Sequence, residues 1–364
     1  MIRCVPRSEI EDDVWDGFCA TSPTAWFRNT TEFLQFTTEM SFDQNIKDRS
    51  FGVFDDHTLK ALIALTVQPL HANPELYEFG MGGTPIPYPA FAEMSLKDET
   101  KLLKIIFSEI DRLAAEDHIV QARFFVDPLS PTLLSGRQRY NPFLKFGGHS
   151  TELTTNIIAL HQTEEALLHD MARGHRTDIM FAQKQKYTVT IFDKTTITEA
   201  VFAQYQNLHL RAAGRKTRPD ESWQTMLRWI TNGQAILSFI HMSGESEYVS
   251  GALSITYQNK AYYGSGATDP DHEKIRGLGH WLQWETMRYL KKQGITHYET
   301  GWNYYPIISS EVASPKELAI GHYKSLFGGM ILPLWRADKY YSLSWLQQKQ
   351  QTLIEEFMRN QNKV

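Results

Sequence analysis

Residues 257–302, YQNKAYYGSGATDPDHEKIRGLGHWLQWETMRYLKKQGITHYETGW, decide the fold that this sequence predicts. The aromatic, β-favouring residues 261–268 predict a strand, and a polar loop containing glycine follows it. Apolar residues at helical spacing over residues 280–293 predict an amphipathic helix, and residues 296–300 read as a second strand. We therefore expect a β-loop-α-β unit.

The loop of this unit brings Arg276, Gly277 and Gly279 to the N-terminus of the expected helix. The N–H groups of a first helical turn have no partner within the helix, and the helix dipole favours an anion at that end. Glycine also lets a backbone approach a ligand closely. The loop is therefore a candidate phosphate site.

The composition is that of a soluble globular protein, with 42% hydrophobic and 22% charged residues. A chain of 364 residues fits two domains of ordinary size. The net charge of −5 argues against extended nucleic-acid binding, so we expect no DNA partner. Cys4 and Cys19 alone provide neither a disulfide framework nor a thiolate metal site. We find no signal peptide or membrane-spanning run, and we expect a cytoplasmic protein.

Helices and strands alternate along the rest of the chain, and residues 127–150, which contain Pro and Gly without periodicity, connect two halves. The sequence thus predicts an α/β protein with domains at residues 1–150 and 151–340, followed by a helix over 341–364. The first half predicts helices at 9–20, 24–40 and 98–116 and strands at 51–54, 59–67, 76–79 and 119–126. The second half predicts strands at 154–160, 187–192, 235–241 and 248–257 and helices at 163–185, 197–211 and 222–230.

Several motifs follow one another in an order that resembles a known family. They are RGHRTDIMFAQKQ with His175, Arg176, Lys184 and Lys186, VSGALSITYQNKAYYGSGA, RGLGH, GITHYETG and HYKSLFGG. Over residues 153–334 this order is similar to the FemAB-type branch of the GNAT (N-acetyltransferase) superfamily. The resemblance implies an α/β (α+β) fold of tandem GNAT-like domains, each a mixed, mostly antiparallel sheet flanked by helices. The first half of the chain matches only in layout.

The string RGLGH resembles the acyl-CoA loop of the superfamily, written Q/R-x-x-G-x-G/A. The resemblance implies that Arg276, Gly277, Gly279 and His280 bind acyl-CoA as the cofactor and acyl donor. Trp281 stands where the family has a small residue, and its ring would obstruct a backbone approach to the pyrophosphate. The alternative is a glycine-rich helix start without a ligand.

The string HYKSLFGG is similar to the family signature FK-x-x-FGG, with Tyr323 in place of Phe. The resemblance implies that Lys324 lies at the acyl-transfer centre, where a cation neutralises the charge that develops when an amine attacks a carbonyl. The amine must also lose a proton. We prefer Glu299 as the base, because a partly buried carboxylate can have a raised pKa. Other candidates are Asp269, His272 and His322.

Residues 208–223, LHLRAAGRKTRPDESW, place four cations between two expected helices. Arg binds phosphate and carboxylate groups through two parallel hydrogen bonds. The segment therefore suits a nucleotide-linked sugar, CoA or the acceptor end of a tRNA, and a solvated basic loop is the alternative. The candidate substrate-binding residues are Arg211, Arg215, Lys216, Arg218, Trp223, Tyr263, Trp302 and Asn303.

From the resemblance we expect an N-acyltransferase that moves an acyl group from acyl-CoA to an amine of an amino sugar or cell-envelope precursor by direct attack. The first alternative is an aminoacyl-tRNA-dependent enzyme that acts on a peptidoglycan precursor. The second is a non-catalytic module that binds a glycan or a protein. The sequence shows no metal-binding His pair, so we expect no metal. Apolar residues over 342–362 suit a helix that docks on the body, forms a dimer or contacts a membrane surface peripherally.

Overall fold

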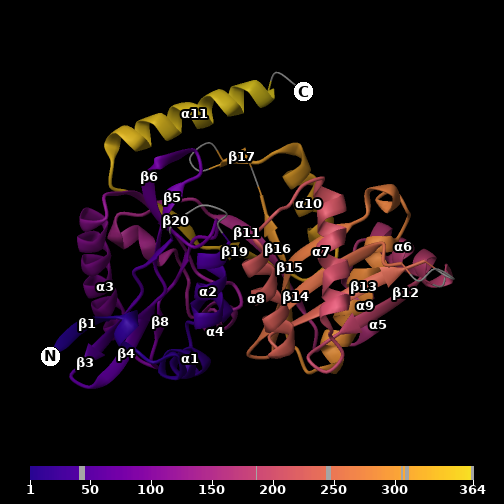
Figure 1. The fold of residues 1–364 in the computed structure, drawn as a ribbon, viewed down its shortest axis with the longest axis horizontal. Helices are drawn as coiled ribbons and strands as arrows, with labels where there is room; N and C mark the ends of the chain where they lie inside the picture. Colours follow the sequence, from indigo (N-terminus) through magenta and orange to yellow (C-terminus); the bar gives the residue numbers. More distant parts are fainter. Residues whose placement is uncertain (41–45, 186, 243–246, 305, 308–310, 362–364) are drawn as a thin grey trace. The chain divides into compact units, whose positions relative to one another are not determined.

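A computed structural model divides the chain into two compact units (Figure 1). The first unit comprises residues 1–154, 304–318 and 333–364, and the second comprises 155–303 and 319–332. The chain therefore passes between the units more than once. The structure describes residues 1–40, 46–185, 187–242, 247–304, 306–307 and 311–361.

The first unit contains two sheets with helices around them. One sheet has the strand order β1-β3-β4-β8, and the other has the order β10-β20-β9-β6-β5-β2 with β7 paired to β9. The strands are β1 (Ile2–Pro6), β2 (Lys47–Asp48), β3 (Phe51–Asp55), β4 (Thr58–Ile63), β5 (Thr66–Leu70), β6 (Asn73–Gly80), β7 (Ile86–Pro87), β8 (Ala90–Phe91), β9 (Ile119–Phe125), β10 (His149–Ser150) and β20 (Arg336–Tyr340). The helices are η1 (Arg7–Glu9), α1 (Asp12–Thr21), η2 (Phe27–Asn29), α2 (Thr31–Glu39), α3 (Leu96–Glu116), α4 (Pro131–Leu134), η3 (Pro142–Phe146) and α11 (Leu343–Gln361). The short pair β17 (Pro306–Ile307) and β18 (Glu311–Val312) also belongs to this unit.

The expected domain of residues 151–340 is not one continuous piece. Strand β20 lies between β10 and β9 in the sheet of the first unit, and Arg336 pairs with Phe125 in antiparallel register. Helix α11 belongs to the same unit, where the Trp345 indole N–H donates to Gln121 Oε1 at 2.9 Å. Local periodicity does not reveal which distant strands pair, so the sequence placed β20 in the wrong half.

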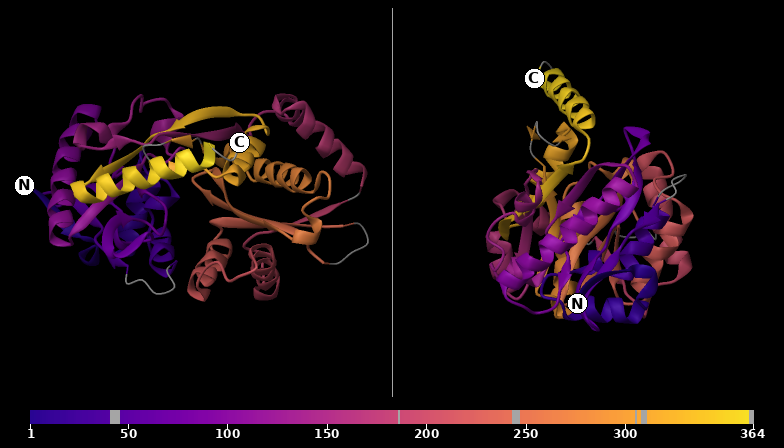
Figure 2. Two further views of the ribbon diagram at one scale, coloured as in Figure 1. Left: turned by 90° about the horizontal axis from the view of Figure 1, so that it is seen from above. Right: turned by 90° about the vertical axis from the view of Figure 1, so that its left-hand side faces the viewer.

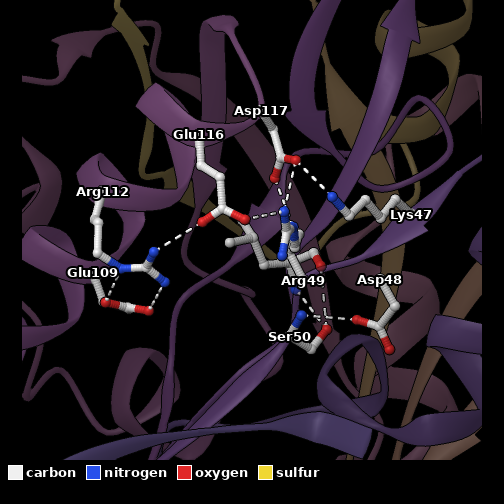
Figure 3. A network of polar contacts seen from close by, with 9 residues as sticks. Lys47, Asp48, Arg49, Ser50, Glu109, Arg112, Glu116 and Asp117 are labelled. Carbon is white, nitrogen blue, oxygen red and sulfur yellow. Dashed lines mark hydrogen bonds and ion pairs between the residues drawn. The ribbon is translucent and has the colours of Figure 1, made fainter.

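Helix α3 ends in a network of ion pairs that joins it to β2 and the residue after it (Figure 3). Arg49 donates to both oxygens of Asp117, at 2.6 and 2.7 Å, and to Glu116 at 2.7 Å. Lys47 donates to Asp117 at 2.7 Å. Burial opposes ionisation of Asp117, but Arg49 and Lys47 outweigh it and lower the pKa of Asp117; Arg49, followed by Arg112, lowers the pKa of Glu116.

Replacing Arg49 by alanine should destabilise the first unit by about 1–2 kcal/mol, because a two-bond pair to a largely covered carboxylate is stronger than an isolated surface pair. The contribution is present above the ordinary pKa of a carboxylic acid and is lost as the pH falls through the lowered pKa of Asp117. Urea unfolding of both proteins at neutral and acidic pH measures this. An undiminished difference in acid would show that the network is not its source.

The second unit is built on one seven-stranded sheet with the order β12-β13-β14-β15-β16-β11-β19. Strands β12 to β15 form an antiparallel meander, and β15 and β16 are parallel. The strands are β11 (Leu153–Ala159), β12 (Thr188–Phe192), β13 (Ala235–His241), β14 (Ser250–Tyr257), β15 (Lys260–Thr268), β16 (His297–Asn303) and β19 (Met330–Leu334). The helices are α5 (Glu164–Asp170), α6 (Arg173–Lys184), α7 (Glu199–Ala213), α8 (Asp220–Thr231), η4 (Pro270–His272), α9 (Leu278–Lys292) and α10 (Pro315–Ser325), of which α10 begins in the first unit.

Helices cover both faces of this sheet (Figure 2). On one face Trp284 of α9 packs in a core cluster with Ile236 of β13, and Thr286 donates to Ser238 at 2.9 Å. On the other face Tyr205 of α7 contacts Phe239 of β13, with ring centroids 6.1 Å apart. Alternate residues of a strand face opposite sides, so the two helix layers use different residues of β13. Both units thus confirm the expected mixed fold with mostly antiparallel sheets.

The helix expected over residues 163–185 is interrupted, because Met171 and Ala172 are extended between α5 and α6. Ala172 N–H donates to Leu326 O at 3.0 Å, and Arg176 donates to the Met171 carbonyl at 2.8 Å. Contacts with distant residues therefore set the break. None of the helices within the described residues is both long and apolar enough to cross a membrane.

Candidate active site

The strands β15 and β16 part in the middle of the second sheet. They pair only from Lys260 to Tyr262 on β15 and from His297 to Glu299 on β16. Beyond Tyr262 the register of β15 against β14 shifts, and Gly264 has no pairing residue on β14. This extra residue forms a β-bulge. A bulge bends its strand and increases the local twist, and this bend accompanies the opening between the two strands.

Lys324 of α10 reaches this opening. A Cβ placed on Gly301 of β16 would lie 2.6 Å from Lys324 Nζ, so glycine leaves room for the ammonium. The nitrogen also lies 5.3 Å from the ring centroid of Tyr263, within the range of a cation–π contact. Burial lowers the pKa of Lys324, and the negative charge of Glu299 partly opposes that change. We find no carboxylate within ion-pair distance of this nitrogen in the part of the chain that the structure describes.

Glu299 is completely buried behind the same opening. Its Oε1 accepts a hydrogen bond from Thr155 Oγ1 at 2.7 Å, and the same hydroxyl lies 3.2 Å from Gly301 O. Thr155 of β11 thus joins the carboxylate to the backbone beside Lys324. The sequence placed Glu299 and Lys324 together through the family resemblance, but Thr155, which is 144 positions from Glu299, carried no signal of its own.

The other candidate bases lie elsewhere or are exposed. Asp269 forms an ion pair with Arg211 at 2.7 Å and faces His272 at 3.4 Å. Burial opposes ionisation of Asp269, but the bonds from Arg211, the backbone and His272 lower its pKa. His322 is exposed on α10. A carboxylate with a lowered pKa is a weak proton acceptor, so Asp269 is a poor base.

Helix α6 covers the glycine-rich loop before α9. Arg276 Nε donates to Asp178 Oδ1 at 2.8 Å, and its guanidinium lies 4.7 Å from the Phe181 ring centroid. Gly277 has a φ of 77°, and a Cβ there would meet the Asp178 carbonyl oxygen at 2.7 Å. The loop glycine therefore permits close packing of α6 on the start of α9.

The next residues of the loop are covered as well. A Cβ on Gly279 would lie 3.1 Å from Tyr323 Oη. Burial, reinforced by His175, lowers the pKa of His280 to about 4, so His280 is neutral near pH 7. Trp281 does not project into the loop, because its indole N–H donates to Tyr187 O at 3.2 Å.

The loop carries a negative charge beside its arginine. The Asp178 carboxylate binds Arg276 and lies 3.8 Å from His280 Nε2. That Arg276, Gly277, Gly279 and His280 hold acyl-CoA therefore stays a prediction. Sequence reasoning missed Asp178, although it lies in the quoted string RGHRTDIMFAQKQ.

The basic segment does not form one cluster of cations. Arg211 binds Asp269, Lys216 binds Asp220 at 2.8 Å, and Arg215 is exposed. Arg218 turns inward and stacks on the buried Trp223, with 4.5 Å from its guanidinium carbon to the ring centroid. The expected anion site over residues 211–218 therefore divides into separate contacts.

The remaining candidate residues lie on the two parted strands. Tyr263 stands on β15 beside Lys324, and burial raises the pKa of Tyr263 to about 12. Trp302 and Asn303 end β16, and Asn303 is buried. The structure therefore brings Tyr263, Glu299 and Lys324 together. No group of three His, Cys, Asp or Glu residues suited to a metal ion occurs within the described ranges.

Comparisons with known proteins agree with this fold. Residues 176–315 match the family model described as an acetyltransferase (GNAT) domain. No curated protein matches the sequence. The structure is similar to a crystal structure of FemX, with 15% identity, a TM-score of 0.63 and coverage of 94% of this chain and 98% of that one.

Two further structures share the fold at low identity. The C-terminal domain (DUF2156) of a putative lysylphosphatidylglycerol synthetase from Agrobacterium fabrum is 14% identical, with a TM-score of 0.53 and coverage of 89% of this chain and 95% of that one. A tandem GNAT protein from the clavulanic acid biosynthesis pathway is 10% identical, with a TM-score of 0.53 and coverage of 94% and 99%. Residues 176–315 are thus similar to a GNAT acetyltransferase domain, and the chain as a whole shares its fold with FemX and with the tandem GNAT protein.

Proposed function

We propose that the protein transfers an aminoacyl group from an ester donor to an amine of a cell-envelope precursor, with Lys324 at the reacting carbonyl. The observation that carries the proposal is the partly buried ammonium of Lys324 beside Gly301, where β15 and β16 part. A carbonyl in that opening lies within reach of a cation in a medium of low dielectric constant. Such a charge stabilises an oxyanion more strongly than it would in water.

In this reaction the amine nitrogen attacks the ester carbonyl, and the C=O electron pair moves to the oxygen, which faces Lys324. The new C–N bond remains when the C–O bond to the leaving group breaks. The leaving alkoxide takes the proton that the amine loses, directly or through water. No covalent bond to the enzyme forms.

Glu299 supports this centre as a positioning residue. Its carboxylate is completely buried and its Oε1 already accepts from Thr155, so it is poorly placed to receive a proton from an incoming amine. Its charge instead favours the protonated form of Lys324. Removing that charge should lower the pKa of Lys324 further and reduce the fraction of active enzyme at neutral pH.

We propose an aminoacyl-tRNA as the donor because the Asp178 carboxylate, which pairs with Arg276, would repel the diphosphate of CoA at the loop of residues 276–280. The name of one structural relative, lysylphosphatidylglycerol synthetase, indicates a lysyl group on its product, whereas the structure of the tandem GNAT protein is described as being without AcCoA. The fold alone therefore does not select the donor. Acyl-CoA is the second candidate, and the GNAT domain match over residues 176–315 favours it.

The variant Arg276→Ala distinguishes between aminoacyl-tRNA and acyl-CoA as the donor. If Arg276 serves only Asp178, the variant should keep its KM for a charged tRNA within about twofold, because no lost contact reaches the donor. Transfer of radiolabelled amino acids from total charged tRNA, and of acetyl groups from acetyl-CoA, to a peptidoglycan precursor measures both reactions. Efficient use of acetyl-CoA together with a tenfold or larger rise of its KM in Arg276→Ala would overturn the donor assignment.

The activity should fall at high pH because Lys324 must be charged. Burial lowers the pKa of Lys324, so kcat should be constant below that pKa and decrease as the pH rises through it, earlier than for an exposed lysine. Lys324→Arg should move this decrease to higher pH, since a guanidinium stays charged. The pH profiles of kcat for both proteins test this, and coincident profiles would exclude Lys324 as the titrating group.

A further inference from the structure

The first unit contains a separate cavity. None of the residues that line it belongs to the transfer centre. Its volume is about 590 Å³, within the range of about 300–1,000 Å³ that small-molecule sites occupy. One wall is the first two turns of α3, and the other is the loop between α4 and η3 with the end of η3. All of these segments belong to the first unit, so the cavity is complete within it.

The floor of the cavity is a buried polar group built around Glu99. Glu99 is 3% exposed, its Oε1 accepts from the Tyr88 hydroxyl at 2.7 Å, and its Oε2 lies 3.2 Å from Arg137 Nη2. Arg137 Nη2 also donates to the Met94 carbonyl at 2.6 Å. Burial and then Glu99 raise the pKa of Tyr88 well above its ordinary value, so its hydroxyl remains a donor.

This arrangement fixes the guanidinium of Arg137 and leaves part of it for a ligand. Both of its contacts with described residues use Nη2. A guanidinium carries five N–H donors in a planar fork, and those on Nη1 and Nε are not engaged by these bonds. A fork held in one orientation suits two parallel hydrogen bonds to a phosphate or carboxylate.

The opening of the cavity is lined by two further cationic side chains and by two apolar ones. Arg139 and Lys145 are exposed and line the opening, so three cationic side chains face one carboxylate that is already bonded. Leu96 and Tyr140, also in the lining, are 50% and 47% exposed. Lys145 Nζ lies 4.8 Å from the Tyr140 ring centroid, so charge and apolar surface meet at one edge. A gap left by imperfect packing would not carry a buried carboxylate that orients an arginine.

We infer that this cavity binds a phosphate ester with an apolar group, the phosphate on Arg137, Arg139 and Lys145 and the apolar group against Leu96 and Tyr140. Such an ester can be a soluble molecule or the headgroup of an anionic lipid. The inference does not depend on the proposed transfer reaction, because no residue of the second unit takes part.

Calorimetric titration with phenyl phosphate and with inorganic phosphate tests the soluble ligand, and sedimentation with vesicles of phosphatidylglycerol and phosphatidylcholine in equal amounts tests the lipid. We expect saturable binding in at least one arm, with phenyl phosphate tighter than inorganic phosphate. Arg139→Ser with Lys145→Ser should weaken binding by about tenfold or more, because two charge-assisted hydrogen bonds are lost. Arg137→Lys, which keeps the charge but not the fork, should weaken binding of phenyl phosphate.

The matched control is Lys97→Ser with Lys104→Ser, which removes the same charge from exposed positions of α3 that do not line the cavity. This variant and Lys324→Met should bind as the wild type does. If both double variants lost the same binding affinity, the binding would come from unspecific charge attraction. A loss of binding affinity in Lys324→Met would place the ligand at the transfer centre. Either result, the absence of binding in both arms, or inorganic phosphate binding as tightly as phenyl phosphate would overturn the inference.

Discussion

Lys324→Met should lower kcat by about 10²–10³-fold while the fold and the KM for the acceptor change little, because the loss of one oxyanion-stabilising group affects mainly the transition state. Methionine fills a similar volume without a charge, so it removes the cation without opening a large cavity. Single-turnover transfer from the aminoacylated tRNA measures the effect, and thermal unfolding checks that the variant is folded.

Two companion variants make this prediction specific. Lys324→Arg should retain part of the activity, because it keeps a cation at the opening. Gly301→Ala should lower kcat although Lys324 is present, since the new Cβ would stand 2.6 Å from Nζ and alanine would be strained at the φ of 110° that Gly301 adopts. A Lys324→Met enzyme with wild-type kcat would show that the transfer centre lies elsewhere in the protein.

Asp127→Ala should destabilise the first unit by about 3–5 kcal/mol, because it leaves a buried guanidinium without its carboxylate. Arg28 and Asp127 are 5% and 1% exposed, and Arg28 Nη1 lies 2.6 Å from Asp127 Oδ2. Asp127 Oδ1 also accepts from the Leu129 N–H at 3.0 Å, so the variant loses a turn contact as well. Urea unfolding followed by tryptophan fluorescence measures the loss.

The surface pair of Arg7 and Asp12 provides the matched control, since Asp12 is 70% exposed. Asp12→Ala should cost less than about 1 kcal/mol. Arg28→Met combined with Asp127→Leu should cost less than Asp127→Ala alone, because the double variant removes both charges of the pair from the core. Equal costs for Asp127→Ala and Asp12→Ala would contradict the argument from burial.

The sequence predicted the elements whose pattern is local. The apolar face of residues 98–116 corresponds to α3, and the turn chemistry of residues 55–58 corresponds to the β3–β4 hairpin, where Asp56 has a φ of 53°. The expected strand at 235–241 coincides with β13. Periodicity and turn residues act over a few positions, which is why these predictions needed no knowledge of the tertiary structure.

The candidate site depended on contacts that no local pattern contains. Arg276 and Asp178 are 98 positions apart in the sequence. The sequence therefore predicted a phosphate site at the loop without showing that the Asp178 carboxylate pairs with Arg276. The cations of residues 211–218 looked like one patch, but each finds a different neighbour. Lys324 was identified only by resemblance, and the structure places its ammonium beside Gly301, where β15 and β16 part.

The position of β20 has a consequence for synthesis of the chain. This strand lies inside the sheet of the first unit, between β9 and β10, yet its residues follow the whole of the second unit's main segment, 155–303. Domains are generally made and folded in order from the N-terminus. Here the first unit cannot close its sheet until residues 336–340 leave the ribosome, so the part translated first must finish folding last, with the edges of β9 and β10 in need of protection until then.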